Sequence, residues 1–432
     1  MNLIIASLIV FSLTILILTL VLILARQKLM PQGKVKVIIN GEKELAVEPG
    51  VSLLTALSNN GIFLPSACGG GGTCAMCRCK VLEGGGEVLP TELNHLSRKE
   101  VQDHVRLACQ VKVRQDLKIE VPPEVFGIKK WECEVISNYN VASFIKEFVV
   151  KLPEGEELKF QAGDYIQIDV PPTTVDFKDI DITAHPKYHK RPDEFQTEWD
   201  KYDLWSLKMV NEEPIFRAYS MANHPAEGNI IMLNVRIATP PWDRERNRWM
   251  DVPPGKCSSY IFSRKPGDKV KISGPYGEFH INLNSKREML YIGGGAGMAP
   301  LRSHIFHLFK TLKIRDRKVS FWYGGRTRRE LFYIEDFREI EREFDNFRFF
   351  VSLDNPLPED NWQVKEHIDA PGDGFVGYIM PVVYEYYLKN HPEPEEIEYY
   401  FCGPPAMNAS VLRTLDELGV PDDQIYFDDF GG

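Results

Sequence analysis

The segment Cys68-Gly-Gly-Gly-Gly-Thr-Cys74-Ala-Met-Cys77 determines how the amino-terminal part of the chain must fold. Its spacing is C-x5-C-x2-C, and Cys109 follows on a separate predicted strand. Five of the eight cysteines lie between Cys68 and Cys109, a distribution that suits clustered ligands better than disulfide staples. The pattern therefore indicates a metal centre built on one glycine-rich loop.

Two kinds of centre compete for these thiols. A [2Fe–2S] cluster needs four thiolates around two irons, and glycines let a loop wrap closely around it. Structural zinc sites usually combine two CxxC-like pairs, and this chain has one. The spacing favours a [2Fe–2S] cluster held by Cys68, Cys74, Cys77 and Cys109. Cys79 remains ambiguous, although strand alternation makes it a neighbour of the loop rather than a fifth ligand.

The loop resembles that of the vertebrate-type [2Fe–2S] ferredoxins, whose spacing is one residue longer than the plant type. The resemblance implies a β-grasp fold for residues 34–128. Local signals agree with a small α+β unit. Asn40-Gly41 is a hairpin turn signal, and residues 52–60 are predicted as a helix that begins after Ser52 and stops at Gly61.

The amino terminus carries a different signal. Residues 3–25 form an uncharged run of 23 residues, long enough to cross a bilayer as a helix. A signal peptide is less suitable, because no basic region precedes the run and no small-residue cleavage pattern follows it. Arg26 and Lys28 lie just after the run, which predicts a single-pass anchor with the remaining domains in the cytoplasm.

The 432 residues suggest two to four domains, and the net charge of −10 argues against a nucleic-acid partner. Residues 129–286 are rich in short strands and predict a β-barrel. Residues 287–432 alternate strands and helices, which predicts a doubly wound α/β domain. A charged, aromatic insertion at 175–213 interrupts the barrel. We expect a solvated surface insertion; a docking surface is the alternative, and a metal site at His185 and His189 is disfavoured.

Two short motifs in the barrel region have residue types that suit a flavin. Arg217 can pair with a pyrophosphate, Tyr219 can stack on the isoalloxazine ring, and Ser220 can hydrogen-bond near N5. A second motif offers backbone N–H groups and hydroxyls for the same phosphates, and its residues are Gly255, Ser258 and Ser259. Each motif is weak by itself, since a tyrosine at a barrel rim is more often simple packing.

Two strand-to-helix turns in the last domain suit a dinucleotide, because glycines let the backbone approach a pyrophosphate at a helix N-terminus. The residues are Gly293, Gly294, Gly295, Gly297 and Pro300 in the first turn, and Cys402, Gly403 and Pro404 in the second. With the flavin motifs, their order resembles the ferredoxin–NADP⁺ reductase superfamily over residues 131–432. That resemblance implies FAD at the first two motifs and a nicotinamide nucleotide at the last two.

The same resemblance places Cys402 near the nicotinamide and Phe430 over the flavin, as candidate catalytic-site residues. Cys402 is equally well explained as a small buried residue at a strand end. Arg326, Thr327 and Arg328 could hold a 2′-phosphate and select NADPH, or they could be solvated surface residues, which leaves the nucleotide open on the residues alone.

Anchor, ferredoxin and reductase in one chain resemble the F subunits of Na⁺-translocating NADH:quinone oxidoreductases. The resemblance implies NADH as donor, FAD and a [2Fe–2S] cluster, and partner subunits of a bacterial inner-membrane respiratory complex that reduce quinone. Two alternatives remain: the reductase component of a multicomponent oxygenase, which is usually soluble, and a non-enzymatic membrane-anchored zinc-binding adaptor.

Overall fold

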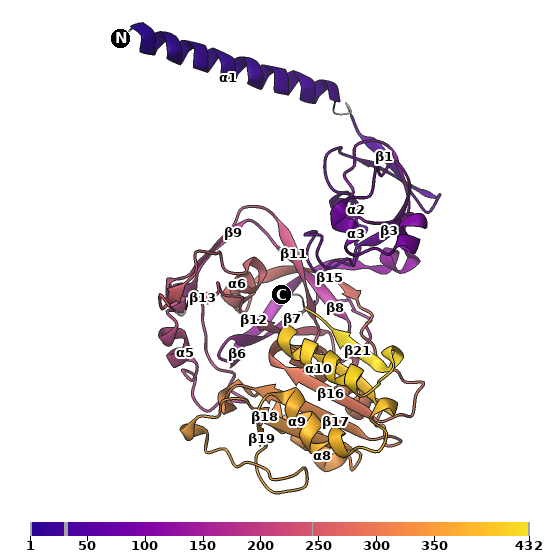
Figure 1. The fold of residues 1–432 in the computed structure, drawn as a ribbon, viewed down its shortest axis with the longest axis vertical. Coiled ribbons are helices and arrows are strands. Elements are labelled where there is room, and N and C mark those ends of the chain that lie inside the picture. Colours follow the sequence, from indigo (N-terminus) through magenta and orange to yellow (C-terminus); the bar gives the residue numbers. More distant parts are fainter. Residues whose placement is uncertain (1, 30–32, 244, 431–432) are drawn as a thin grey trace. The chain divides into compact units, whose positions relative to one another are not determined.

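The computed structural model describes residues 2–29, 33–243 and 245–430, and the chain divides into two compact units, Met1–Lys129 and Lys130–Gly432. The first unit begins with helix α1 (Asn2–Leu29), drawn in indigo in Figure 1. Its side chains at 7–21 are described, and all of them are exposed. Among the described residues, no helix has both the length and the apolar character needed to cross a membrane.

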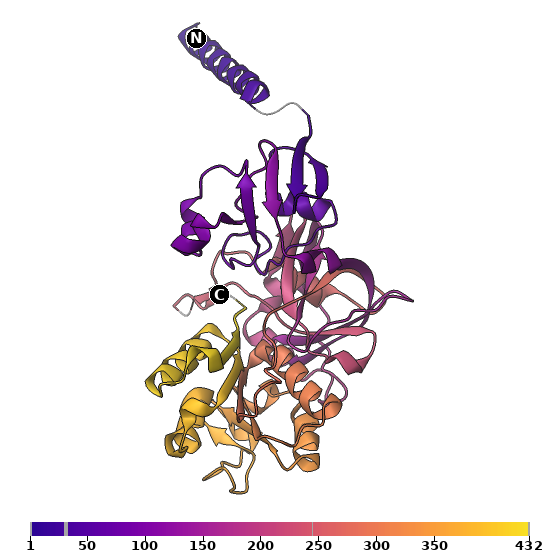
Figure 2. The same cartoon turned by 90° about the vertical axis from the view of Figure 1, so that its right-hand side faces the viewer.

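The rest of the first unit is a mixed five-stranded sheet with short helices. Its strands, in the order β2-β1-β5-β3-β4, are visible in Figure 2. They are β1 (Val35–Ile39), β2 (Lys43–Val47), β3 (Arg78–Glu83), β4 (Val105–Leu107) and β5 (Leu117–Glu120). The helices are α2 (Leu53–Asn59), α3 (Pro90–Leu93) and α4 (Arg98–Gln102).

The local predictions for this unit are confirmed. The β1–β2 hairpin turns at Asn40 and Gly41, which both have positive φ. Helix α2 begins after Ser52, whose hydroxyl accepts a hydrogen bond from the Thr55 amide at 3.2 Å. Strand β5 pairs in parallel with β1 and antiparallel with β3, so a strand from late in the unit occupies the centre of the sheet.

A curled antiparallel sheet opens the second unit, with strand order β11-β8-β15-β6-β7-β12. A bridge between Met221 and Leu233 joins the chain just after β11 to β12, so the sheet closes on itself as the predicted barrel. Helix α6 (Lys256–Ser263) packs into the barrel core. The strands are β6 (Lys129–Ala142), β7 (Ile145–Lys151), β8 (Tyr165–Val170), β11 (Ile215–Ser220), β12 (Ile230–Arg236) and β15 (Lys269–Tyr276).

The insertion at 175–213 is not the solvated excursion that its composition predicts. Phe177, Phe195 and Trp199 are fully buried and belong to the protein interior. The insertion contains η2 (Phe177–Asp179), α5 (Gln196–Lys201), η3 (Leu204–Ser206) and β10 (Lys208–Asn211), which pairs with β9 (Thr173–Asp176). The prediction was wrong because widely spaced aromatic residues, rather than a periodic stripe, anchor this segment.

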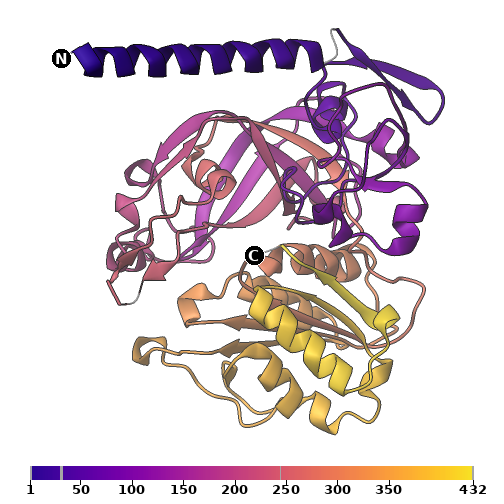
Figure 3. The same cartoon turned by 45° about the horizontal axis from the view of Figure 1, so that its top comes forward.

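The last domain is a parallel six-stranded sheet with helices on both faces, as Figures 1 and 3 show. The strand order is β19-β18-β17-β16-β20-β21. The strands are β16 (Met289–Gly294), β17 (Val319–Gly325), β18 (Phe347–Leu353), β19 (Phe375–Val376), β20 (Glu398–Cys402) and β21 (Ile425–Asp428). The helices are α7 (Met298–Phe306), α8 (Ile334–Glu343), α9 (Ile379–Tyr386) and α10 (Pro405–Glu417).

Side chains of alternate residues of β16 pack into the hydrophobic cores on the two faces of this sheet. Met289 and Tyr291 pack with α7 and α8, whereas Leu290 and Ile292 pack with α9 and α10. The chain order reverses between β16 and β20, and open parallel sheets bind ligands at the carboxyl ends of the strands at such a point. The glycine turn after β16 and the Cys402 turn after β20 both lie there.

Candidate cofactor sites

The four predicted cluster ligands come together as two pairs of thiols. The Sγ atoms of Cys68 and Cys74 are 3.3 Å apart, and the thiols of Cys77 and Cys109 hydrogen-bond to each other. The hydrogen bond from Cys74 lowers the pKa of the Cys68 thiol, and the hydrogen bond from Cys77 lowers the pKa of the Cys109 thiol. Cys68 and Cys74 are half-buried, whereas Cys77 and Cys109 are buried.

This arrangement suits a dinuclear cluster better than one ion. The thiols form two pairs, Cys68 with Cys74 and Cys77 with Cys109. Two irons with two thiolates each need two pairs of thiols, and tetrahedral zinc needs four ligands around one point. The residues present therefore fit a [2Fe–2S] cluster.

Cys79 lies on β3 opposite Arg106, where burial raises the pKa of its thiol to about 12. The fifth cysteine is thus a protonated core residue. Sequence reasoning missed its neighbour, the buried pair of Arg106 with Glu92, whose Nη2 and Oε2 are 2.7 Å apart. Glu92 also accepts from the Leu107 amide at 3.0 Å, which ties α3 to the strand that leads to Cys109.

Gln110 adds a contact to the cluster thiols. Its Nε2 donates to Cys109 Sγ at 3.5 Å, and its Oε1 accepts from the Thr91 hydroxyl at 3.1 Å. The threonine bond holds the amide of Gln110 beside the sulfur. Hydrogen bonds to ligand sulfurs are among the factors that set the reduction potential of iron–sulfur clusters.

The flavin motifs meet at one side of the barrel. Arg217, Tyr219 and Ser220 end strand β11, and Arg217 and Tyr219 lie within electrostatic range of Cys257 on α6. Burial raises the pKa of Tyr219. Arg217 Nη1 donates to its own chain at Phe216 O, 2.8 Å away.

The second flavin motif is packed tightly around the N-terminus of α6. A Cβ on Gly255 would lie 2.6 Å from the Ala238 Cβ, so a larger residue does not fit. Ser258 Oγ accepts from the Ala238 amide at 3.0 Å, and Ser259 Oγ donates to Gly255 O at 2.7 Å. Both hydroxyls thus contact the backbone of the turn that the sequence assigns to phosphates.

Strand β21 brings a carboxylate to the end of the flavin motif. Ser220 Oγ donates to Asp428 Oδ2 at 2.7 Å, and Asp428 lies opposite Cys402 in the parallel register of β20 and β21. Burial, the largest cause, raises the pKa of Asp428. The structure therefore joins the flavin and nicotinamide motifs through a residue that no motif marked. Phe430 follows, 46% exposed, and the glycines 431–432 lie outside the described residues.

The two nucleotide turns are adjacent and closely packed. A Cβ on Gly297 would lie 2.0 Å from Cys402 O, and a Cβ on Gly403 would lie 2.4 Å from Met407 Cε. Gly293 and Gly294 are also confined, by Leu301 and Met407. Pro300 lies in the first turn of α7, and Pro404 precedes α10.

Of the three candidate 2′-phosphate residues, Arg328 has other partners. Arg328 Nη2 lies 2.6 Å from Asp373 Oδ2, and its guanidinium lies over the Trp362 ring. Thr327 is buried, and Arg326 is exposed. The structure thus does not bring these three side chains together on one ligand.

Three domain families match the chain. Residues 37–114 match the 2Fe-2S iron-sulfur cluster binding domain, residues 196–281 the oxidoreductase FAD-binding domain, and residues 291–413 the oxidoreductase NAD-binding domain. The expected cofactor set of a [2Fe–2S] cluster, FAD and a nicotinamide nucleotide is confirmed by these matches. The individual ligand residues remain predictions.

Relatives match the chain from end to end. The F subunit of the Na(+)-translocating NADH-quinone reductase of Neisseria meningitidis serogroup C is 54% identical over 429 residues, which cover 99% of this chain and 100% of the relative. That of Mannheimia succiniciproducens is 53% identical, covering 98% and 97%. Among solved structures, the Amycolatopsis cytochrome P450 reductase GcoB has a TM-score of 0.60 at 22% identity, covering 92% of this chain and 98% of that one, a likeness of fold alone. With full-length identity of this order, the chain belongs to the family of F subunits of the Na(+)-translocating NADH-quinone reductases.

Proposed function

We propose that this chain is the electron-input subunit of such a reductase, oxidising NADH and passing electrons through its cluster to partner subunits and quinone. When bound, FAD accepts a hydride and releases electrons singly, and a [2Fe–2S] cluster takes one at a time. The observation that carries the proposal is the contact of Ser220 with Asp428 beside Cys402, because it unites the flavin and nicotinamide motifs.

In this proposal the chain's residues bind and orient the cofactors. Cys68, Cys74, Cys77 and Cys109 would hold the [2Fe–2S] cluster. The flavin is bound by Arg217, Tyr219, Ser220, Gly255, Ser258 and Ser259. The dinucleotide is bound by Gly293, Gly294, Gly295, Gly297, Pro300, Cys402, Gly403 and Pro404, and Phe430 covers the flavin.

Asp428 lies beside the flavin motif, and burial, the largest cause, raises its pKa. Its raised pKa keeps the carboxyl protonated at a higher pH than an ordinary aspartate, and Ser220 Oγ is its hydrogen-bond partner. We infer that the pair moves a proton to or from the position that faces Ser220 Oγ. The residue Cys402, whose thiol pKa is raised by burial, acts there as a protonated thiol rather than as a nucleophile.

NADH suits the nucleotide domain better than NADPH. The guanidinium of Arg328 is paired with Asp373 at 2.6 Å, so one of the two candidate cations for a 2′-phosphate already has a carboxylate partner. Relatives of 51–54% identity named for NADH support the same choice.

We further propose that α1 anchors the subunit in the bacterial inner membrane, with the domains at 34–128 and 129–432 in the cytoplasm. The support is the uncharged run at 3–25, the helical backbone over Asn2–Leu29 and the basic residues that follow. Leu8, Phe11 and Leu16 are among its exposed apolar side chains. Partner subunits of the complex would receive the electrons and perform any sodium transport.

Anaerobic titration of the purified chain with NADH, followed by visible absorbance and EPR, tests the function. We expect bleaching of the flavin and then the EPR signal of a reduced cluster. A colourless protein would support the zinc adaptor instead, and a cluster that stays oxidised with NADH would contradict the electron path. Extraction of the full chain from membranes only by detergent, and release of a chain lacking residues 1–25, would separate this family's function from that of a soluble oxygenase reductase.

A further inference from the structure

The middle of the insertion at 175–213 lies on the nucleotide-binding domain. Lys187 Nζ is 2.6 Å from Asp336 Oδ1, and the Tyr188 hydroxyl donates to Asp336 Oδ2 at 3.0 Å. Asp336 is on α8, so a segment inserted in the flavin barrel reaches the other domain of the second unit. The Tyr188 ring also packs edge-on against Tyr333, with centroids 5.2 Å apart.

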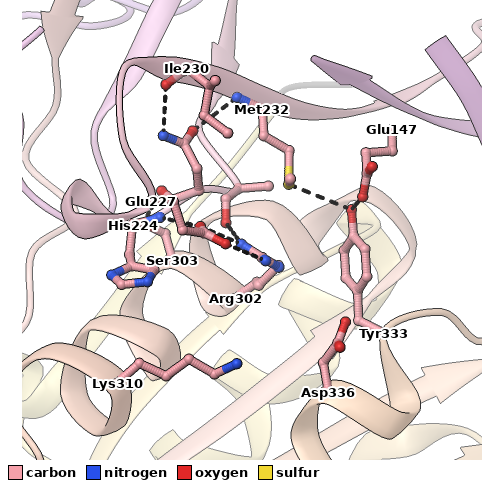
Figure 4. Close-up of polar contacts among 12 residues, drawn as sticks. Glu147, His224, Glu227, Ile230, Met232, Arg302, Ser303, Lys310, Tyr333 and Asp336 are labelled. Atoms are coloured by element: carbon pink, nitrogen blue, oxygen red, sulfur yellow. Dashed lines mark hydrogen bonds and ion pairs between the residues drawn. The ribbon is translucent and has the colours of Figure 1, made fainter. Parts of the chain in front are cut away.

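Glu147 on β7 is the point where three segments meet. The Tyr333 hydroxyl donates to Glu147 Oε2 at 2.6 Å and accepts from Asn234 Nδ2 at 2.7 Å. From the insertion, His185 Nε2 lies 3.2 Å from Glu147 Oε1. Figure 4 shows Tyr333 pointing from the nucleotide-binding domain at Glu147 of the barrel. Barrel, insertion and nucleotide-binding domain thus share one buried carboxylate.

Tyr333 has the backbone of a constrained residue. Its φ is +59°, which a bulky residue rarely adopts, and its side chain is fully buried. Such a conformation persists where the surrounding contacts determine it, and it is frequent at functional sites. The contacts of its hydroxyl with Glu147 and Asn234 are among them.

A second set of contacts in Figure 4 ties the nucleotide turn to the flavin strand. Arg302, on the helix that follows the glycine turn, pairs with Glu227 through two bonds of 2.7 and 2.8 Å and donates to Ala222 O at 2.7 Å. The Ser303 hydroxyl donates to Asn223 O at 2.8 Å. These acceptors lie just after Ser220, and the guanidinium of Arg302 lies 5.2 Å from the centre of the Tyr333 ring.

We propose that Tyr333 is a positioning residue for the transfer from NADH to FAD, and that the insertion at 175–213 is the strap that holds it on Glu147. The inference rests on the proposed function. Transfer requires reacting atoms about 3–3.5 Å apart, and a displacement of about 1 Å can cost about 100-fold in rate. The nicotinamide turns and Ser220 are on different domains, so the contacts between these domains set that separation.

The test is anaerobic stopped-flow reduction of the full chain by NADH, and by NADH with deuterium at the transferred position, recorded on flavin absorbance. Tyr333→Phe removes only the hydroxyl. We expect its limiting rate of flavin reduction to fall about tenfold or more, with FAD content and the half-saturating NADH concentration unchanged and the isotope effect retained. Tyr384→Phe, an exposed tyrosine on α9, is the matched control and should keep the parent rate.

Tyr188→Phe tests the strap at a half-buried residue of the insertion. The substitution removes the hydroxyl that contacts Asp336 and leaves the contacts of Glu147 in place. We expect a smaller fall in the limiting rate, again at unchanged FAD content. A limiting rate within twofold of the parent in both variants would overturn the proposal, as would a rate loss explained by lost FAD or by weaker NADH binding alone. If NADH does not reduce the flavin of the parent chain, the proposed function is wrong. If NADH reduces the parent and both variants at the same rate, the proposed function stands and the role of Tyr333 is wrong.

Discussion

The cysteine loop of the first unit and the nucleotide turn of the second are both rich in glycine, but for different physical reasons. In the cysteine loop, Gly70 has φ +93°, a conformation that side chains disfavour, while a Cβ there or on its neighbour Gly71 would make only ordinary contacts of 3.6 Å or more. In the nucleotide turn, Gly297 has ordinary φ, but a Cβ would lie 2.0 Å from Cys402 O. Gly70 is needed for the direction of the backbone, whereas Gly297 is needed for the contact between two turns.

This contrast shows where each site is vulnerable. The cysteine loop depends on its thiols, since the backbone around them can adjust toward solvent. The nucleotide turn depends on the absence of a single atom, since its neighbour is backbone that cannot move away. Substitutions that separate these two dependencies should leave one cofactor working while the other fails.

The most severe loss, that of the whole cluster, is expected in Cys74→Ala. The cluster would lose a ligand of one thiol pair, whereas the flavin lies in the other unit. EPR of the dithionite-reduced protein should show no cluster signal, and flavin reduction by NADH should stay within about twofold of the parent rate, because a remote substitution leaves the transfer geometry in place. Cys79→Ala, at the buried cysteine outside both pairs, should keep the signal. A normal signal in Cys74→Ala would refute the ligand assignment.

Gly297→Ala should impair flavin reduction by NADH and leave the cluster intact, the reverse of Cys74→Ala. The added methyl group overlaps Cys402 O, so the turn must open, and we expect flavin reduction by NADH to slow by about 100-fold. Dithionite should still reduce both flavin and cluster in the same protein. Gly127→Ala, where a Cβ would meet nothing within 4 Å, is the control. Wild-type kinetics in Gly297→Ala would show that the close contact does not matter for binding.

Arg217→Ala extends the comparison to the flavin. Bonds between a guanidinium and a pyrophosphate are charge-assisted and contribute about 1.5–3 kcal/mol each, so the dissociation constant for FAD should rise roughly tenfold or more. Flavin content after gel filtration and titration of the apoprotein measure it. Arg246→Ala, with a side chain 70% exposed, should retain its flavin. Equal flavin occupancy in the two variants would count against the role of Arg217.

Acid should weaken the second unit through His304, which lies on α7 behind the nucleotide turn. Burial, the largest cause, lowers its pKa from 6.5 to about 3, in contact with Phe279, Tyr291 and Tyr400. Below pH 6.5 the unfolded chain therefore binds more protons than the folded one, and the free energy of unfolding should fall by about 2 kcal/mol between pH 7 and pH 5.

Urea unfolding of the parent and of His304→Gln at both pH values checks this expectation. Glutamine keeps a donor for Phe279 O, 2.9 Å from the histidine Nε2, but it cannot take up a proton. The variant should lose most of the pH dependence, although His224 and His307, whose pKa values are also lowered, contribute to the remainder. An unchanged drop in the variant would mean that other groups cause it.

The mildest substitutions compare neighbouring glycines. Gly70→Ala should destabilise the first unit by about 1 kcal/mol, because alanine disfavours the left-handed conformation. Gly71→Ala should cost less than half of that. Thermal unfolding followed by cluster absorbance distinguishes the two variants. Equal losses would show that the loop is limited by space and not by backbone direction.

What could be predicted from the sequence is what short-range chemistry determines. Ser52 starts its helix, Asn40 and Gly41 turn their hairpin, and the apolar run at 289–292 is a central strand of the parallel sheet. The cysteine spacing leads to two thiol pairs because a loop of that length can bring them together. The glycine turns occur where the strand order reverses, as their position after predicted strands requires.

The rest depends on contacts between distant segments, which spacing does not reveal. Asp428 became part of the site only because β21 pairs with β20 and reaches Ser220. The burial of Trp199, whose indole Nε1 donates to Ser143 O at 2.8 Å, could not be seen in a stretch of mixed charges. Glu92 and Arg106 likewise look like surface residues until the fold places them together. The isolated aromatic residues within the charged insertion were the sequence signal that could have indicated its burial.

The Arg302–Glu227 pair has a consequence for the ionic conditions under which the reductase unit works. Dissolved salt screens charges that water reaches, and the side chains of Arg302 and Glu227 are 6% and 24% exposed, whereas that of Lys187 is 59% exposed. As ionic strength rises, the Lys187–Asp336 contact should loosen while Arg302 keeps its hold on Glu227. The angle between the two domains should accordingly tolerate large swings in the salt content of the surrounding solution.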